Sequence, residues 1–195
     1  YTLFYDPKSA PKQFKKKEIR ESFLGCVPGI RRHYQWLLPL MPLATESYAL
    51  SEFDVVLSST SAFAKGIITG PKTLHLCYCH TPTRFLWTDT ANYISELRVP
   101  CFIKRLLPLY LSRLRLWDKH ASARVDIFIA NSRTVAGRIK KFYGQESHVI
   151  FTPVDVPTEA TTKITNSHSY FLTGGRLVAY KRYDLAIQEC SRLNL

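Results

Sequence analysis

Short apolar runs alternate with helical patterns through the middle of the chain. Four runs are rich in β-branched and other apolar residues, as buried strands of a parallel sheet are. They span Asp54–Ser59, Leu74–Cys79, Asp126–Ala130 and His148–Phe151. Because helical patterns separate these runs, we predict an α/β fold with a Rossmann-like parallel sheet that helices cover on both faces.

The clearest helix is predicted directly after the third run. Ser132 is a favourable N-cap residue, and Gly144 is placed to end the helix after an aromatic residue. Apolar residues recur between them at helical spacing, at Val135, Ile139 and Phe142. We therefore expect one amphipathic helix between Ser132 and Gly144.

Prolines interrupt two other segments. The apolar segment His33–Leu50 contains Pro39 and Pro42, which limit any helix there to short pieces. Residues 98–123 alternate apolar and basic positions, and Pro108 is expected to kink or divide their helix. This helix is either a core helix with a solvated basic face, which we favour, or one that lies on an anionic membrane surface.

A polar segment divides the chain into two parts. Residues 156–168 contain a proline, several threonines and other polar residues, which is the composition of a linker. Ser169–Thr173 then reads as a strand, and a helical pattern begins at about Lys181. We expect a nearly complete first domain over 1–155 and the first strand–helix unit of a second domain over 169–195.

The composition is that of a globular protein with an excess of positive charge. Charged residues make up 22% of the chain, and the formal net charge is +12. Such an excess favours partners that carry phosphate: nucleic acid, an anionic membrane surface or a phosphorylated substrate. The longest apolar stretch, Trp36–Ala44, contains two prolines and is too short to cross a bilayer.

The cysteines do not suggest a disulfide framework. There are five, and only Cys77 and Cys79 are clustered. With the adjacent His80 these two thiols could ligate a metal, but no second pair of ligands follows at zinc-site spacing. We therefore expect buried thiols in a reducing cytoplasm and no bound metal.

Polar residues follow the predicted strands. Open parallel sheets bind ligands at the carboxyl ends of their strands. In this chain the strand ends carry small, polar or charged residues: Ser58 and Ser59, His80 and Thr81, Asn131 and Ser132, Pro153, and Gly174, Gly175 and Arg176. These residues are candidates for the lining of one shared cleft.

A glycine and two cations near the start of the second domain suit a diphosphate. Gly175 lets the backbone approach a ligand closely. Arg176 offers a planar fork that matches phosphate oxygens, and Lys181 adds a compact charge near the start of the predicted helix. Together they could hold a diphosphate and stabilise it as it leaves.

Four segments of the chain resemble glycosyltransferase family 4, in the branch of bacterial O-antigen and exopolysaccharide mannosyltransferases. They follow one another in the order that the family shows. The segments are LHLCYCHTPTRFLW (74–87), LRLWDKHASARVDIFIANSRTVAGRIKKFYG (114–144), VIFTPVDV (149–156) and GRLVAYKRYDLAI (175–187).

The resemblance implies a GT-B fold, in which two Rossmann-like domains face a cleft. The first domain of such enzymes binds the acceptor and the second binds the nucleotide sugar. Here the second is truncated after its first strand–helix unit. Members of the family retain the anomeric configuration and generally need no metal, so the nucleotide-diphosphate sugar is expected as a co-substrate and no cofactor beside it.

The resemblance also implies roles for single residues. Arg176 and Lys181 match the family's residues that bind the donor diphosphate. His80 matches a histidine of the first domain that faces the transferred sugar and is the candidate catalytic residue. Ser132 and Arg133 match a strand-end motif that lines the cleft.

Two parts of the family pattern are not found in this sequence. The glycine-rich loop would precede Tyr1, and the Glu–seven residues–Glu motif would follow Leu195. At Thr152 the family often has a further proline before Pro153. We therefore interpret the chain as an internal fragment and expect it to be inactive on its own.

The leading hypothesis is a hexosyltransferase at the cytoplasmic face of the membrane. It would transfer a sugar, with mannose the first candidate, to a lipid-linked or polysaccharide acceptor in cell-surface glycan synthesis. One alternative is a sugar-nucleotide epimerase with the same fold. Another is a non-catalytic basic module that binds membrane or nucleic acid, although no nucleic-acid-binding signature is present.

Overall fold

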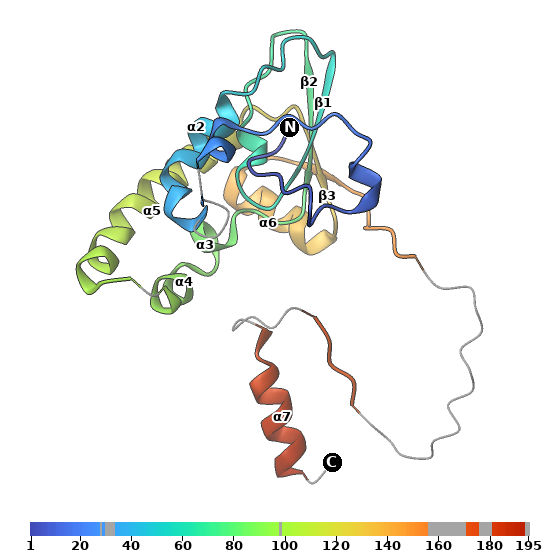
Figure 1. Cartoon of the computed structure of the whole chain (residues 1–195). Helices are drawn as coiled ribbons and strands as arrows, with labels where there is room; N and C mark the ends of the chain where they lie inside the picture. The colour runs from blue at the N-terminus through green and yellow to red at the C-terminus, as the bar shows by residue number, and fades with distance from the viewer. Residues whose placement is uncertain (28, 30–33, 98, 156–170, 176–180, 194–195) are drawn as a thin grey trace. The chain divides into compact units, whose positions relative to one another are not determined.

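The structure is a computed structural model of the chain, which divides into two units, Tyr1–Pro153 and Val154–Leu195. Figure 1 shows their elements. The residues described are 1–27, 29, 34–97, 99–155, 171–175 and 181–193. Arg176 and the predicted linker over 156–168 lie outside them.

The first unit contains a four-stranded parallel sheet whose strands lie side by side in chain order, β1-β2-β3-β4. The strands are β1 (Val55–Thr60), β2 (Leu74–Cys79), β3 (Ile127–Ala130) and β4 (Ser147–Val149). The predicted parallel α/β sheet is thus confirmed. The first three strands lie within one residue of their expected positions.

The fourth strand is shorter than the apolar run that predicts it. It ends at Val149, whereas the prediction extends to Phe151. Its neighbour β3 ends at Ala130, opposite Val149, so the sheet offers little to pair with beyond that point. The backbone N–H of Ile150 still donates to the carbonyl of Ala130 at 2.9 Å, and the ladder then stops.

Helices precede the first strand and fill the connections between the strands. Those described in the first unit are α2 (Met41–Glu46), α3 (Arg84–Trp87), α4 (Thr90–Glu96), α5 (Cys101–Ser122) and α6 (Arg133–Tyr143). The short 3₁₀ helices are η1 (Lys12–Phe14), η2 (Phe23–Cys26), η3 (Tyr34–Leu40) and η4 (Ala64–Gly66).

Two predictions about prolines have different outcomes. The segment around Pro39 and Pro42 does form short helical pieces, η3 followed by α2. Pro108 was expected to kink or divide its helix, and it does not divide it, because α5 continues through it as one helix. A kink at Pro108 stays a prediction. A proline in a helix removes one backbone hydrogen bond, and a helix of this length can continue on either side of that gap.

The predicted ends of α6 are confirmed. The Ser132 side chain accepts a hydrogen bond from the backbone N–H of Val135, which caps the first turn. Gly144 adopts a left-handed conformation with φ of 70° and donates its N–H to the carbonyl of Lys140. Local sequence therefore sets both ends of this helix.

One face of the sheet is covered. Because the strand order is sequential, right-handed crossovers between parallel strands all carry their helices to the same face. Strand residues buried on that face include Cys77, Cys79, Phe128 and Ala130, and they form one core with Ile139 of α6. A second core joins the N-terminal segment to α5 through residues such as Leu24, Met41 and Leu111.

The opposite face of the sheet is apolar and exposed in the described part of the first unit. Val55, Leu57, Leu74 and Ile127 alternate with the covered residues, and Leu57 is 65% exposed. The prediction that helices cover both faces is therefore wrong for this part of the chain. A doubly covered sheet needs a reversal of the strand order, and these four strands contain none.

The second unit contains the helix α7 (Tyr183–Arg192). It begins two residues later than predicted, because Arg182 has a left-handed backbone with φ of 51° and cannot extend the helix. The strand predicted over Ser169–Thr173 is absent from its described part, 171–173. No helix in the described part of either unit combines the length and hydrophobicity needed to cross a bilayer.

Candidate functional site

The carboxyl edge of the sheet brings the predicted site residues of the first unit together. Thr60, Cys79, Ala130 and Val149 lie next to one another across the four strands. The residues that follow them, including His80, therefore begin the loops at one edge. This is the edge at which parallel sheets bind ligands.

His80 is exposed and held in place by its neighbours. Its backbone N–H donates to the carbonyl of Thr60 at 2.8 Å, and its Nε2 shares a hydrogen bond of 3.0 Å with the hydroxyl of Ser59. The ring also meets Tyr78 edge to face, with 5.2 Å between centroids. An exposed imidazole fixed in this way can form a hydrogen bond with a bound ligand without first being ordered.

Tyr78 extends this arrangement toward the end of β4. Its hydroxyl donates to the carbonyl of Ile150 at 3.2 Å and lies 3.1 Å from the hydroxyl of Thr152. The end of β2 and the segment after β4 are thus joined at the same edge. Sequence reasoning named Ser59 among the polar strand ends, and the register of β1 and β2 places it beside His80. It missed Tyr78, which lies two residues before His80 on the same side of the strand.

The other predicted cleft residues differ in how free they are. The Ser132 hydroxyl accepts from the N–H of Val135 and donates to the side chain of Asn131, so helix capping already uses it. Thr81 accepts a long hydrogen bond of 3.4 Å from Arg138. Arg133 is exposed in the first turn of α6, where the helix N-terminus favours an anion.

A buried charged network lies within the covered face. The ammonium of Lys65 and the carboxylate of Asp118 are 2.6 Å apart, and both side chains are 1% exposed. Three further groups donate to the same carboxylate at 2.8 Å: the hydroxyl of Thr83, the indole of Trp87 and the hydroxyl of Tyr143. Every oxygen of this buried carboxylate therefore has partners.

The network ties the loop that begins at His80 to the helices. Lys65 comes from η4, Thr83 from the end of that loop, Asp118 from α5 and Tyr143 from α6. Burial, reinforced by the charge of Asp118, raises the pKa of Tyr143 far above its ordinary value, so this hydroxyl remains a donor. The sequence holds one signal for this network, a single lysine within the apolar run 62–68.

The clustered thiols are structural. Burial raises the pKa of Cys77 to about 11 and that of Cys79 to about 12, so both remain protonated and unreactive. The expectation that they are buried is confirmed. In the described ranges, no three His, Cys, Asp or Glu side chains are grouped so that they could hold a metal ion.

The remaining histidines that the structure describes fall into two kinds. His75 is fully buried on the covered face, and its Nε2 lies 2.8 Å from the hydroxyl of Ser58. Burial lowers the pKa of His75, although the charge of Asp126 acts in the opposite direction. His120 and His148 are exposed, so these three histidines are packing or surface residues.

The predicted diphosphate residues belong to the second unit. Gly175 has φ of 135°, and an added Cβ would come within 2.4 Å of the Tyr183 hydroxyl, so this position requires glycine. That hydroxyl donates to the carbonyl of Gly174 at 2.7 Å and fixes the loop against the start of α7. Lys181 is exposed two residues before α7, and Arg176 lies outside the described residues.

Comparison with known families decides the class of protein. The family model for Glycosyltransferase Family 4 matches residues 2–157. The chain belongs to glycosyltransferase family 4. Membership implies transfer of a sugar from a nucleotide sugar to an acceptor. No match was found among curated proteins or among solved structures.

The residues of this family 4 chain that match the family model include the whole carboxyl edge of the sheet. His80, Thr81, Ser132 and Arg133 all lie within it. The match ends before Gly175 and the two cations that follow it. The family assignment therefore rests on the first unit, and the diphosphate residues rest on chemistry and on the resemblance of their segment.

Proposed function

We propose that this protein is a retaining hexosyltransferase that takes a sugar from a nucleotide-diphosphate donor. The acceptor is a lipid-linked or polysaccharide glycan of the cell surface, and mannose is the first candidate for the sugar. The observation that carries the proposal is the family 4 match over residues 2–157, which includes the edge where His80 is exposed and held. The resemblance of four ordered segments to mannosyltransferases supports the choice of sugar.

The proposed architecture is GT-B. The Rossmann-like domain over 1–155 takes the acceptor, residues 156–168 connect it to the second domain, and 169–195 begin the domain that binds the donor. The parallel sheet of the first unit supports this arrangement, because its open carboxyl edge is where such a domain would face the cleft.

The second domain would hold the leaving group. Arg176 and Lys181 would bind the diphosphate, and Gly175 would let the backbone approach it closely. The bond between the anomeric carbon and the diphosphate oxygen breaks, a bond to the acceptor oxygen forms, and the acceptor proton leaves with the nucleoside diphosphate. Fixed cations stabilise the negative charge that develops on the diphosphate, so no metal is needed in this scheme.

His80 would act on the sugar side of the cleft. Its Nε2 already shares a hydrogen bond with Ser59, and the ring is exposed beside the strand ends. In this position it can form a hydrogen bond with a hydroxyl of the transferred sugar or of the acceptor. Ser132, Arg133 and Thr81 would line the same cleft.

The proposed place of action is the cytoplasmic face of the membrane, with the protein bound peripherally. A net charge of +12 suits both an anionic lipid surface and a diphosphate substrate. A lipid-linked acceptor would also be found there. Nucleic acid is not a proposed partner.

The test is transfer of labelled sugar by the full-length protein, with nucleotide sugars that begin with the mannose donor. Arg176→Ala and Lys181→Ala are each expected to lower kcat by about 10²–10³-fold, the size found when one preorganised donor to developing charge is removed. Lys16→Ala, at an exposed cation of the first unit, is the matched control and should leave transfer unchanged.

Two results would contradict the proposal. Full donor-dependent turnover in both variants would remove the assigned diphosphate site. Interconversion of free nucleotide sugars, with no transfer to an added acceptor, would identify an epimerase instead.

A further inference from the structure

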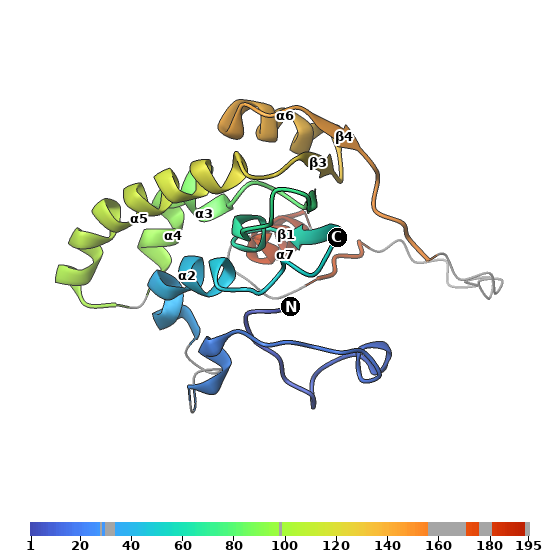
Figure 2. The same cartoon turned by 90° about the horizontal axis from the view of Figure 1, so that it is seen from above.

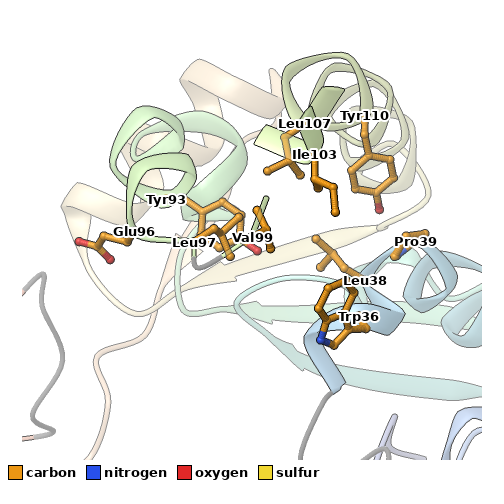
Figure 3. Close-up of a pocket in the computed structure, with 10 residues that line it drawn as sticks. All are labelled: Trp36, Leu38, Pro39, Tyr93, Glu96, Leu97, Val99, Ile103, Leu107 and Tyr110. Carbon is orange, nitrogen blue, oxygen red and sulfur yellow. The ribbon is translucent and has the colours of Figure 1, made fainter. Parts of the chain in front are cut away.

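A cavity of about 550 Å³ lies between η3, α4 and the first half of α5 (Figure 3). This volume is in the range of small-molecule sites. Nine of its ten lining residues are aliphatic, aromatic or proline, and Figure 3 shows the one carboxylate, of Glu96, directed away from the others. None of the lining residues belongs to the carboxyl edge of the sheet.

One polar atom of this cavity has no partner. The hydroxyl of Tyr110 is buried and makes no hydrogen bond in the described part of the chain. Figure 3 shows it directed from α5 toward η3. Burial is the main cause that raises the pKa of Tyr110 to about 12, and the neighbouring Tyr93 adds to it. The hydroxyl is therefore protonated and can donate a hydrogen bond at neutral pH. A ligand that fits this site is therefore mostly hydrocarbon and carries one hydrogen-bond acceptor.

The helix that forms one wall of the cavity also has an exposed apolar stripe. None of residues 101–110 is buried, whereas the second half of α5 packs into the core. Phe102, Leu106 and Leu109 follow one another at helical spacing and are 67%, 63% and 63% exposed. Figures 1 and 2 show this end of α5 projecting beyond the sheet. The stripe is adjacent to the cavity-facing residues of the same turns.

Only positive charge accompanies this stripe. From Cys101 to Trp117 the helix has four cations and no acidic residue. Arg105 lies three residues after Phe102 and four before Leu109, at the side of the stripe, and Arg113 lies four residues after Leu109, at its end. An apolar helix face bordered by cations is the pattern of helices that lie in the surface of an anionic bilayer.

We infer that the first half of α5 docks on an anionic phospholipid bilayer and that the cavity takes one acyl chain of an anionic phospholipid. The exposed stripe would enter the bilayer surface, and Arg105 and Arg113 would meet the phosphate groups. The ester carbonyl of the lipid's acyl chain would accept the hydrogen bond that the Tyr110 hydroxyl does not make within the described residues. This inference deepens the proposed function by naming the membrane partner and the element that meets it.

The experiment measures binding of the full-length protein to vesicles, without any nucleotide sugar. Vesicles of equal parts phosphatidylglycerol and phosphatidylcholine are compared with vesicles of phosphatidylcholine alone. We expect binding to the anionic vesicles at least about tenfold tighter, and about tenfold weaker binding for Phe102→Asp with Leu106→Asp. Leu57→Asp, at an equally exposed leucine of β1, is the matched control and should bind as wild type does.

A second readout tests the cavity itself. Trp36 lies on its wall, so phosphatidylglycerol with brominated acyl chains should quench part of the tryptophan fluorescence. That part should be missing in Trp36→Phe and reduced in Ile103→Phe, which narrows the cavity. Quenching that is unchanged in Trp36→Phe would overturn the acyl-chain site.

The outcomes separate this inference from the proposed function. Equal binding to both kinds of vesicle, or none, would overturn the docking surface, and a protein partner would then be the occupant to seek. Sugar transfer in detergent tests the proposed function independently of docking. Loss of transfer with vesicle binding intact would contradict the proposed function and leave this inference standing.

Discussion

Lys65 and Asp118 show how single buried charges organise the first unit. Both side chains are 1% exposed, and together they connect η4, the end of the His80 loop, α5 and α6. Removing one partner of such a pair leaves the other charge buried without compensation. Breaking a buried ion pair in this way lowers the stability strongly. Replacing both partners by well-packed apolar side chains changes the stability much less.

The first prediction follows from this pair. Lys65→Met should lower the free energy of unfolding by about 3–5 kcal/mol, because it leaves the carboxylate of Asp118 charged in the core. The measurement is urea unfolding followed by circular dichroism. Lys140→Met breaks the exposed ion pair with Glu146 and is the control, which should unfold at nearly the wild-type midpoint. Equal effects of the two substitutions would contradict this account of the network.

A second residue-scale prediction concerns His75 and pH. Because its folded pKa is lowered, the unfolded chain binds more protons than the folded one below about pH 6.5, the ordinary pKa of histidine. Stability is therefore fully present above that pH and falls as the pH drops toward the folded pKa. The slope is at most about 1.4 kcal/mol per pH unit.

The pH dependence can be measured by urea unfolding between pH 5 and 7. His75→Gln should flatten the fall in this range, because glutamine does not take up the proton. His120→Gln, at an exposed histidine, should leave the slope as in wild type. A slope that survives in His75→Gln would assign the effect to other groups.

At the scale of elements, α6 is the helix whose boundaries local sequence determines most completely. It has a serine N-cap and a left-handed glycine C-cap, and one side packs on the sheet. Its two glycines have opposite roles. Gly144 adopts a conformation that glycine favours, whereas Gly137 lies within the helix with open space around an added Cβ.

Replacing each of these two glycines by alanine is predicted to change the stability of the protein in opposite directions. Gly144→Ala should destabilise the protein by about 1 kcal/mol, because φ of 70° is strained for alanine. Gly137→Ala should stabilise it by about 0.5–1 kcal/mol, because alanine is the better helix former. Thermal unfolding of the two variants beside wild type checks both. The same direction of change in both would contradict the assigned roles.

The elements could be predicted from sequence wherever the deciding interactions are local. The three longer strands and both ends of α6 were predictable because apolar runs and capping residues determine them. The end of β4 was not predictable from sequence, because it depends on where the neighbouring strand β3 stops. The continuity of α5 through Pro108 could not be predicted from sequence either, because one missing hydrogen bond can divide a helix or only bend it.

At the scale of the whole molecule, the described part of the first unit covers the sheet on one face only. The apolar pattern of the strands could not reveal this, because a run such as 54–59 looks the same whether its second face is covered or exposed. Strand order decides the question, and it is a property of the topology. Leu57 and its neighbours on that face are accordingly exposed in the first unit.

The candidate site was predictable in its location but not in its supporting contacts. Polar residues after successive strands indicated the carboxyl edge, and His80 could be named from its motif. Ser59 reaches His80 only through the register of β1 and β2, which the sequence does not display, whereas Tyr78 meets it from two residues earlier in the chain. Gly175 has a positive φ, Arg176 lies outside the described residues, and their binding of a diphosphate stays a prediction.

The central claim is that sugar transfer takes place at the carboxyl edge beside His80. The most direct measurement is kcat/KM for labelled sugar transfer by the full-length protein with His80→Ala, and His120→Ala is the control. His80 is exposed, so the variant should unfold like wild type. We predict that kcat/KM falls by about ten- to a hundredfold, the size of one lost hydrogen bond to substrate. Unchanged transfer in a folded His80→Ala protein would contradict the account.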